Sequence, residues 1–244
     1  MITVELQGGL GNQLFQIAAI ESIATEHGRE LCLPNTPKTS HSTANYYQTI
    51  LRNWKDRVND IGSCLHQHER TYAFEPWNLP SVPVKLFGYF QNYRYIPSSF
   101  SSRLVLPEVP SLDGAFLHIR GGDYVNHPLH DVKLEAYYRR AIQMFPFGTK
   151  FYVFTNDIQY TKTMTWLHDI DYSFVDEPDE VRSLALMSRC RAGGICANST
   201  FSWWGAYINL NNRTRTLVVP SKWFNDPSIY VDGYFFPGCT ICQV

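Results

Sequence analysis

The spacing of apolar residues along the chain switches between the pattern of a buried strand and that of a helix. Residues 2–7 alternate as a strand does, and a glycine-rich turn follows them directly. Residues 12–27 then carry apolar side chains at helical spacing, and Gly28 is a typical C-terminal stop. Residues 31–33 resume as a second strand. This order of strand, turn, helix and strand predicts an α/β unit with parallel strands.

The same alternation continues along the rest of the chain, less regularly between residues 34 and 80. A segment rich in serine and proline, residues 97–110, predicts a linker between two sets of elements. We therefore expect two α/β halves, residues 1–105 and 106–244. Further predicted strands lie at 84–90, 115–120, 151–154, 172–175 and 194–197, and further helices at 46–54, 133–144, 161–168, 181–189 and 201–209.

Composition narrows the class of protein. The 244 residues are 44% hydrophobic, which is enough for a substantial core, and a net charge of -1 gives no sign of a nucleic-acid-binding face. No run approaches the ~20 apolar residues of a membrane span, and the first residues lack the pattern of a secretion signal. We therefore expect a cytoplasmic protein that neither binds nucleic acid nor crosses a membrane.

The six cysteines do not form a recognisable framework. Cys239 and Cys242 have the spacing of half a zinc or redox motif, but no second pair has metal-ligand spacing. Buried reduced thiols are the expected state, and no metal site is predicted.

The segment 118–124 carries the strongest candidate chemistry. An apolar run, residues 115–117, leads into Arg120, two glycines and Asp123. Arginine offers a planar fork that suits a phosphate, and Gly121 and Gly122 allow the backbone to approach an anion closely. In open α/β sheets ligands bind at the carboxyl ends of strands. The alternative is a strand-end arginine paired with Asp123 across a surface turn.

The turn that contains Gly9, Gly11 and Asn12 lies between a strand and a helix, where anions bind at helix N-termini. A dinucleotide fingerprint would require a glycine where Leu14 stands and an acid near residues 34–35. We therefore do not expect nicotinamide binding. Either the turn is structural, or Asn12 and the backbone amides face a cleft between the halves.

Two further strand ends carry polar side chains. Asn198, Ser199 and Thr200 precede a helix, where they could cap it and also present hydroxyls to a phosphate. The alternative is an ordinary cap beside a buried tryptophan pair. Asp157 follows another apolar strand, and a plain turn aspartate is its alternative. Together with Arg120, these strand ends predict one ligand site in the second half.

Ordered along the chain, these motifs resemble those of the α-1,2-fucosyltransferases, glycosyltransferase family 11, which are related to the protein O-fucosyltransferases. The resemblance extends from Gln7 to about Trp223. The motifs that carry it are 8–16, 88–91, 118–124 and 198–206, with supporting matches at 137–138, 141–142, 154–157, 186–188, Cys190, Pro220 and Trp223.

The resemblance implies an α/β, GT-B-like fold with two Rossmann-like halves facing a central cleft. Residues 1–105 would serve the acceptor and residues 106–244 the donor, GDP-fucose. Such enzymes transfer L-fucose with inversion to a glycan hydroxyl, here galactose O2, and need no metal or other cofactor. The only D-x-D triplet, 169–171, lies away from the candidate strand ends.

The resemblance also implies roles for individual residues. Arg120 would stabilise the departing diphosphate, His118 would lie near the guanosine, and Asn12 would face the reaction centre. Asp123 is the candidate base, with donor binding or holding Arg120 as its alternatives. The expected donor-binding residues are Gly9, Gly11, His118, Arg120, Asp157, Asn198, Ser199, Thr200 and Phe201.

The chain also departs from the family pattern. Gly121 stands where the family usually has a second arginine, and the acidic residue expected near Ser183 is missing, although Asp179 or Glu180 could replace it. Two other functions therefore stay open. One is a transferase of the same fold that uses another nucleotide sugar, and the other is a catalytically silent protein that binds a nucleotide or a carbohydrate. Beyond the galactose O2 that the resemblance implies, the sequence does not identify the acceptor or its linkage, and it does not predict the oligomeric state.

Overall fold

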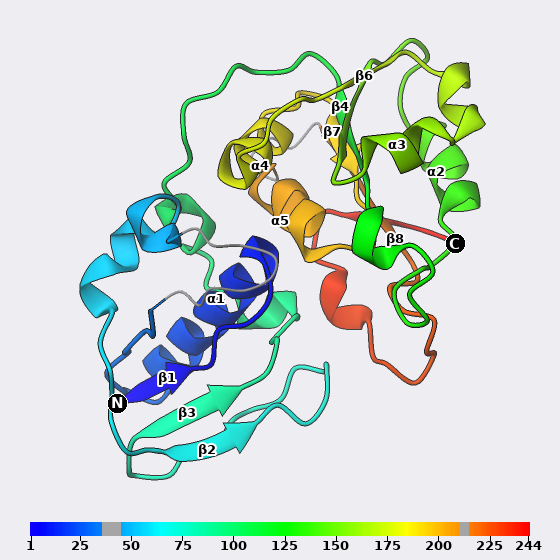
Figure 1. Ribbon diagram of the computed structural model, residues 1–244. Helices are drawn as coiled ribbons and strands as arrows, with labels where there is room; N and C mark the ends of the chain where they lie inside the picture. Colours follow the sequence, from blue (N-terminus) through cyan, green and yellow to red (C-terminus); the bar gives the residue numbers. More distant parts are fainter. Residues whose placement is uncertain (36–44, 210–214) are drawn as a thin grey trace. The chain divides into compact units, whose positions relative to one another are not determined.

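The computed structural model describes residues 1–35, 45–209 and 215–244 (Figure 1). The chain forms two compact units. Unit 1 comprises Met1–Leu106 and the short segment Tyr230–Tyr234, and unit 2 comprises Pro107–Ile229 and Phe235–Val244. Among the described helices, none has the length and apolar character needed to cross a membrane.

Unit 1 is built on a parallel sheet of three strands in the order β1-β3-β2. Its strands are β1 (Ile2–Val4), β2 (Leu65–His68) and β3 (Val84–Phe87), and the long helix α1 (Leu10–Glu26) follows β1. Ile2 and Leu31 form an isolated parallel bridge on the other side of β1. The chain order therefore reverses between β1 and β3, which makes their carboxyl ends the switch point of this sheet.

Two predictions for unit 1 need correction, and one strand was missed. The predicted strand at 31–33 is reduced to isolated bridges, since Pro34 has no N–H to extend the ladder. The predicted helix at 46–54 is two 3₁₀ turns, η1 (Tyr46–Gln48) and η2 (Arg52–Arg57), because Thr49 leaves the helical region. The edge strand β2 was not predicted, because its mostly exposed side chains do not alternate between apolar and polar.

Unit 2 contains a sheet of six strands, all parallel, in the order β6-β5-β4-β7-β8-β9. Numbered within the unit, this is the 3-2-1-4-5-6 order of the doubly wound dinucleotide-binding fold, with its switch point between β4 and β7. The strands are β4 (Ala115–Ile119), β5 (Phe151–Thr155), β6 (Tyr172–Phe174), β7 (Gly193–Ile195), β8 (Thr216–Pro220) and β9 (Thr240–Cys242).

Helices connect these strands. They are α2 (Glu135–Ile142), α3 (Ile158–Lys162), α4 (Glu180–Ser188) and α5 (Thr200–Asn209), with short 3₁₀ turns such as η5 (Gly122–Tyr124) and η6 (Thr165–Asp169). The helix predicted at 161–168 is divided between α3 and η6, because Met164 between them is extended. Strands β8 and β9 were not predicted.

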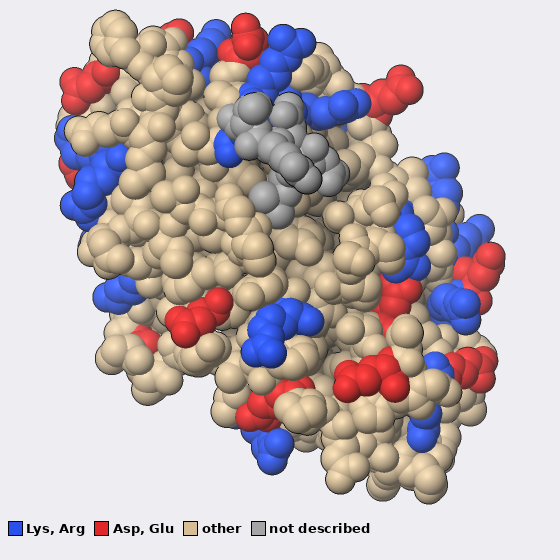
Figure 2. All heavy atoms as spheres, turned by 180° about the vertical axis from the view of Figure 1, so that it is seen from behind, with Lys and Arg blue, Asp and Glu red and all other residues tan. Residues whose placement is uncertain are grey.

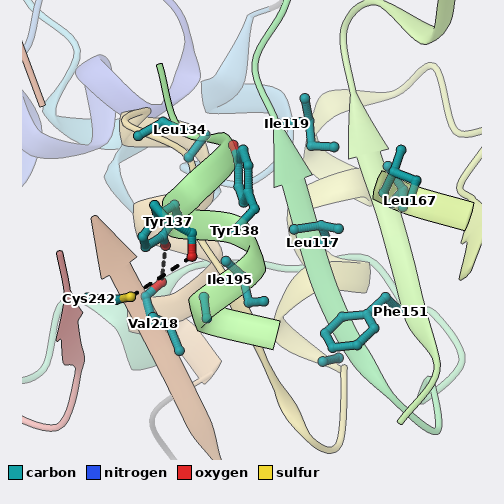
Figure 3. Close-up of a cluster of buried hydrophobic side chains, with 14 of the residues drawn as sticks. Leu117, Ile119, Leu134, Tyr137, Tyr138, Phe151, Leu167, Ile195, Val218 and Cys242 are labelled. Carbon is teal, nitrogen blue, oxygen red and sulfur yellow. Dashed lines mark hydrogen bonds between the residues drawn. The ribbon is translucent and has the colours of Figure 1, made fainter. Parts of the chain in front are cut away.

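The core of unit 2 lies between α2 and one face of the sheet (Figure 3). Alternate residues of β4, among them Leu117 and Ile119, point to this face. The hydroxyl of Tyr137 donates to the carbonyls of Cys196 and Val218 at 2.8 and 3.1 Å, so the helix is tied to two strand segments by one buried group. The opposite face of β4 therefore receives Phe116 and His118, on the side of α5.

The α/β prediction is thus confirmed. All six cysteines are free; four are buried and Cys64 and Cys239 are partly exposed. On the face that Figure 2 shows, the basic and acidic side chains of the described residues are interspersed rather than gathered into one field.

Candidate functional site

His118 is the penultimate residue of β4 and is only 3% exposed. Its carbonyl accepts a hydrogen bond of 2.9 Å from the Tyr138 hydroxyl, and its ring centroid lies 5.8 Å from that of Phe201. Burial, assisted by the charge of Arg120, lowers the pKa of His118 from 6.5 to about 3. The Nδ1 atom has no hydrogen-bond partner within the described part of the chain. The strand therefore presents a neutral imidazole with one unsatisfied nitrogen.

Arg120 follows β4 directly and is held on two sides. Its Nη2 atom donates to Asp123 Oδ1 at 2.7 Å, and its guanidinium lies 5.0 Å from the ring centroid of Tyr124. The side chain is 22% exposed, and Nε has no partner among the described residues. The ion pair that the sequence suggested as an alternative is thus present. It keeps the charged fork extended at the carboxyl end of the strand.

The backbone amides of the glycine turn after Arg120, which we expected to approach an anion, are hydrogen-bonded within the protein. The N–H of Gly121 donates to Asn156 Oδ1 at 2.9 Å, and the N–H of Gly122 donates to Asp157 Oδ2 at 3.3 Å. Side chains that follow β5 therefore already occupy the amides that we expected to approach an anion. Arg120 is therefore the remaining candidate for anion recognition on this turn.

Asp157 also has a structural role, as the N-cap of α3. Its Oδ1 atom accepts the N–H of Tyr160 at 2.9 Å and so caps α3. A Cβ on Gly121 would lie 2.8 Å from Asp157 Cβ and 2.9 Å from Tyr160 Cδ1. The space where the family pattern has a second arginine is therefore filled, and only glycine fits there without a shift.

The second polar strand end lies between β7 and α5. Asn198 is buried, and its Nδ2 atom donates to the carbonyls of His130 at 3.0 Å and Trp223 at 2.9 Å. Ser199 is also buried, and its hydroxyl accepts the N–H of Phe201 at 3.4 Å. Thr200 and Phe201 are partly exposed. Asn198 therefore fixes two loops, and Ser199 caps the helix.

The tryptophans of the same motif belong to the core. Trp203 and Trp204 are fully buried and meet edge to face, with ring centroids 5.3 Å apart. Trp203 also contacts Tyr207 and Phe236 at 4.9 and 5.0 Å. The cap and the aromatic core thus occur together, as the sequence allowed.

A pocket of about 320 Å³ opens beside Arg120. Its wall includes Tyr124 and His130, whose rings stack at 4.8 Å and 20°. Burial lowers the pKa of His130, and nearby His127 lowers it further. Aromatic walls with a few polar groups are typical of small-molecule sites.

In unit 1, the predicted turn leads directly into α1. Gly9 precedes the helix, and its carbonyl accepts the N–H of Gln13 at 3.1 Å; Gly11 is buried in the first turn. Asn12 is partly exposed, and its Oδ1 atom accepts from Gln91 Nε2 at 2.8 Å. These three predicted residues therefore belong to one unit.

The other predicted residues belong to unit 2. There His118 lies against Phe201, and Arg120 forms an ion pair with Asp123. Asp157 accepts a hydrogen bond from Gly122, in the turn that follows Arg120. That the two groups of residues face one cleft stays a prediction.

Sequence reasoning missed several residues that organise the turns. Glu69 Oε2 accepts the N–H groups of Tyr89 and Phe90 at 2.8 and 3.1 Å, and burial raises the pKa of this carboxyl. Gln16 is fully buried and donates to the carbonyl of Gly88 at 2.9 Å. Gln16 lies on the apolar face of the predicted helix, and a polar residue at such a position indicates a buried hydrogen bond. Nothing in the sequence around Glu69 indicated its role.

Among the described residues, no cluster of three or more His, Cys, Asp or Glu side chains could hold a metal ion. Metal independence itself stays a prediction.

The strand order of unit 2, with a cation and a neutral imidazole at the switch point, defines a Rossmann-type α/β protein with a candidate anion site. The sequence model of Glycosyl transferase family 11 matches residues 113–234, half of the chain, and the protein belongs to this family. It is accordingly a glycosyltransferase.

Two relatives from Escherichia coli are similar in sequence. Alpha-1,2-colitosyltransferase is 24% identical over 270 residues, which cover 92% of each chain. O-antigen biosynthesis glycosyltransferase WbnK is 35% identical over 118 residues, which cover 44% of this chain and 38% of that protein.

Two solved structures share the fold. Fucosyltransferase NodZ from Bradyrhizobium matches with a TM-score of 0.51 and 13% identity, over 84% of this chain and 92% of its own. The iron-containing dodecameric glycosyltransferase TibC from enterotoxigenic E. coli H10407 matches with a TM-score of 0.50 and 11% identity, over 98% of this chain and 61% of its own. They confirm the GT-B-like α/β architecture.

Proposed function

We propose that the protein transfers L-fucose from GDP-fucose to a hydroxyl of a glycan, galactose O2, with inversion. The observation that supports this most is the arrangement at the switch point of unit 2, where His118 lies against Phe201 of α5 and Arg120 follows directly after β4. NodZ, whose fold is similar, has been studied in crystals soaked with GDP-fucose. In the reaction, the acceptor oxygen forms a bond to the sugar carbon as the bond to the diphosphate breaks.

Arg120 would stabilise the diphosphate as it departs. Negative charge grows on the leaving group in the transition state, so a cation fixed in advance lowers the barrier. The ion pair to Asp123 and the contact with Tyr124 supply that fixation. In this proposal Arg120 provides the positive charge, and the reaction proceeds without a metal.

His118 and α5 would bind the nucleotide. A buried neutral imidazole can donate or accept a hydrogen bond to a base without adding charge, and Nδ1 has that capacity to spare. Thr200 and Phe201 lie at the first turn of α5, where the helix dipole favours phosphate. Asn198 and Asp157 would act indirectly, by holding the loops in place.

Asp123 has two roles in the proposal. Its ion pair supports the role of orienting Arg120. As a carboxylate that is 43% exposed, it is also the candidate for receiving the acceptor's proton. Asn12 is assigned to the reaction centre by its resemblance to the asparagine of the protein O-fucosyltransferases.

A second donor deserves a direct test. The relative that covers 92% of this chain is named for the transfer of a colitosyl group. Because diphosphate contacts do not select the sugar, the same site could use another nucleotide sugar. Incubation with a panel of nucleotide sugars, with and without lactose, distinguishes the donors by release of free nucleotide. Tight GDP binding without turnover of any donor would instead support the silent binding protein.

The central test is Arg120→Ala. Loss of one preorganised electrostatic contact should reduce fucosyl transfer by about 10²–10³-fold while the fold survives. Arg139→Ala is the matched control, since the ion pairs of Arg139 within the described part of the chain, to Glu135 and Asp169, are exposed. Turnover close to that of the wild type in folded Arg120→Ala protein would refute the assignment. Wild-type transfer should also persist in excess EDTA.

A further inference from the structure

Hydrogen bonds between three side chains connect Tyr234 to the glycine-rich turn of unit 1. The Tyr234 hydroxyl donates to Gln91 Oε1, and Gln91 Nε2 donates to Asn12 Oδ1 at 2.8 Å. Tyr234 is 1% exposed and Gln91 is 7% exposed, so water does not compete for these bonds.

The hydroxyl determines how both amides are oriented. Because Gln91 Oε1 accepts from Tyr234, the amide nitrogen of Gln91 must face Asn12. Asn12 must then turn its oxygen toward Gln91, and its Nδ2 atom lies on the opposite side. Nδ2 lies close to the backbone of Gly8, since a Cβ on that glycine would overlap it.

Tyr234 is itself firmly held. Its N–H donates to the Val231 carbonyl at 3.0 Å, and a Cβ on the preceding Gly233 would lie 2.5 Å from Asn92 Nδ2. The segment Tyr230–Tyr234 belongs to unit 1, although the chain on both sides of it belongs to unit 2. The backbone of Tyr234 is therefore held by contacts within unit 1.

We propose that Tyr234 is a positioning residue for transfer: through Gln91 it holds the Asn12 amide with its NH₂ group directed into the turn after β1. This role rests on the proposed function. The turn lies at the carboxyl ends of β1 and β3, where ligands bind in parallel sheets. An Asn12 amide rotated by half a turn would present an acceptor in place of a donor.

Tyr234→Phe removes the hydroxyl and keeps the ring. We expect kcat for transfer from GDP-fucose to lactose to fall about tenfold, the effect of losing one oriented hydrogen bond. The affinity for GDP should not change, because His118 and Arg120 belong to the other unit. Tyr95→Phe is the control, since Tyr95 is a buried tyrosine of unit 1 whose hydroxyl bonds to the backbone of Glu75. It should leave kcat unchanged.

A double-mutant cycle separates positioning from general destabilisation. In the Asn12→Ala background, Tyr234→Phe should cause no further loss of kcat, since its effect passes through Asn12. Equal losses in both backgrounds would overturn the proposal. Should Tyr234→Phe fail to fold, Gln91→Glu serves instead, because a carboxylate still accepts from Tyr234 but cannot donate to Asn12. It should reduce kcat to a similar extent.

A measurement that does not depend on activity completes the test. In protein labelled with ¹⁵N-asparagine, Asn12→Ala identifies the side-chain amide signal of Asn12. That signal should shift in Tyr234→Phe and stay in place in Tyr95→Phe; an unchanged signal in Tyr234→Phe would overturn the proposal. If the signal shifts but the wild type transfers no sugar, the proposed function fails, and with it the role in transfer, while the orienting contact itself is demonstrated.

Discussion

His118 illustrates how position changes the chemistry of a side chain. In the sequence it is one of eight histidines and ends an apolar run. In the folded protein it is buried beside Arg120, and its pKa falls to about 3. The imidazole is therefore neutral at physiological pH and contributes hydrogen bonds rather than charge.

The same shift predicts a dependence of stability on pH. The unfolded chain protonates His118 near pH 6.5, whereas the folded protein keeps it neutral down to about pH 3. Its contribution to stability is therefore complete above pH 6.5 and is lost progressively as the pH falls toward 3. Urea unfolding in the upper part of this interval should show a shallower slope for His118→Asn than for the wild type. Exposed His168→Asn should keep the wild-type slope.

The turn between β4 and η5 is stabilised by side chains of a neighbouring strand end. Its amides are satisfied by Asn156 and Asp157 from the end of β5, and Asp157 also caps α3. One strand end thus serves as the support for another. The missing second arginine of the family pattern follows from this packing, because Asp157 and Tyr160 occupy its space.

Substitution of Gly121 should therefore be costly. A methyl group at this position meets Asp157 Cβ at 2.8 Å and Tyr160 Cδ1 at 2.9 Å, so one of the two must move. We expect Gly121→Ala to lower the free energy of unfolding by about 1–3 kcal/mol. Gly121→Arg should lower it at least as much and should not increase the affinity for GDP. Urea unfolding and calorimetric titration measure these effects. A Gly121→Ala protein as stable as the wild type would show that the turn adapts.

At the scale of the whole molecule, the chain passes between the two units after Leu106, after Ile229 and after Tyr234. Most of the expected donor-binding residues, among them His118, Arg120 and Phe201, belong to unit 2, whereas Gly9, Gly11 and Asn12 belong to unit 1. Charges of both signs are interspersed on the face in Figure 2.

The proposed division of roles between the units predicts which residues GDP should protect from hydrogen exchange. Hydrogen exchange with GDP present should slow in residues 118–124 and 198–201, because most of the proposed nucleotide contacts lie there, while residues 8–12, where only Gly9 and Gly11 are expected to serve the donor, should change much less. Arg120→Ala should abolish the effect. Equal protection of residues 8–12 would show that the nucleotide also depends on unit 1, and would contradict the proposed assignment of the donor to residues 106–244.

The sequence by itself determined the features that depend on neighbouring residues. Apolar runs that end in glycine or polar residues identified β4, β5 and β7, and helical spacing identified α1, α4 and α5. The residue types at strand ends identified Arg120 and the Asn198 motif. Each of these signals lies within about a dozen residues, where strand and helix periodicity operate.

Only the tertiary structure decided which distant groups meet. The strand order sets the switch point, and the bond from Gly121 to Asn156 spans 35 residues. The bond from Tyr234 to Gln91 spans 143 residues, and nothing near Tyr234 in the sequence indicates that it belongs to unit 1. Strands β2, β8 and β9 likewise became recognisable only through their pairing. Such contacts depend on how whole elements pack, and local periodicity carries no information about that packing.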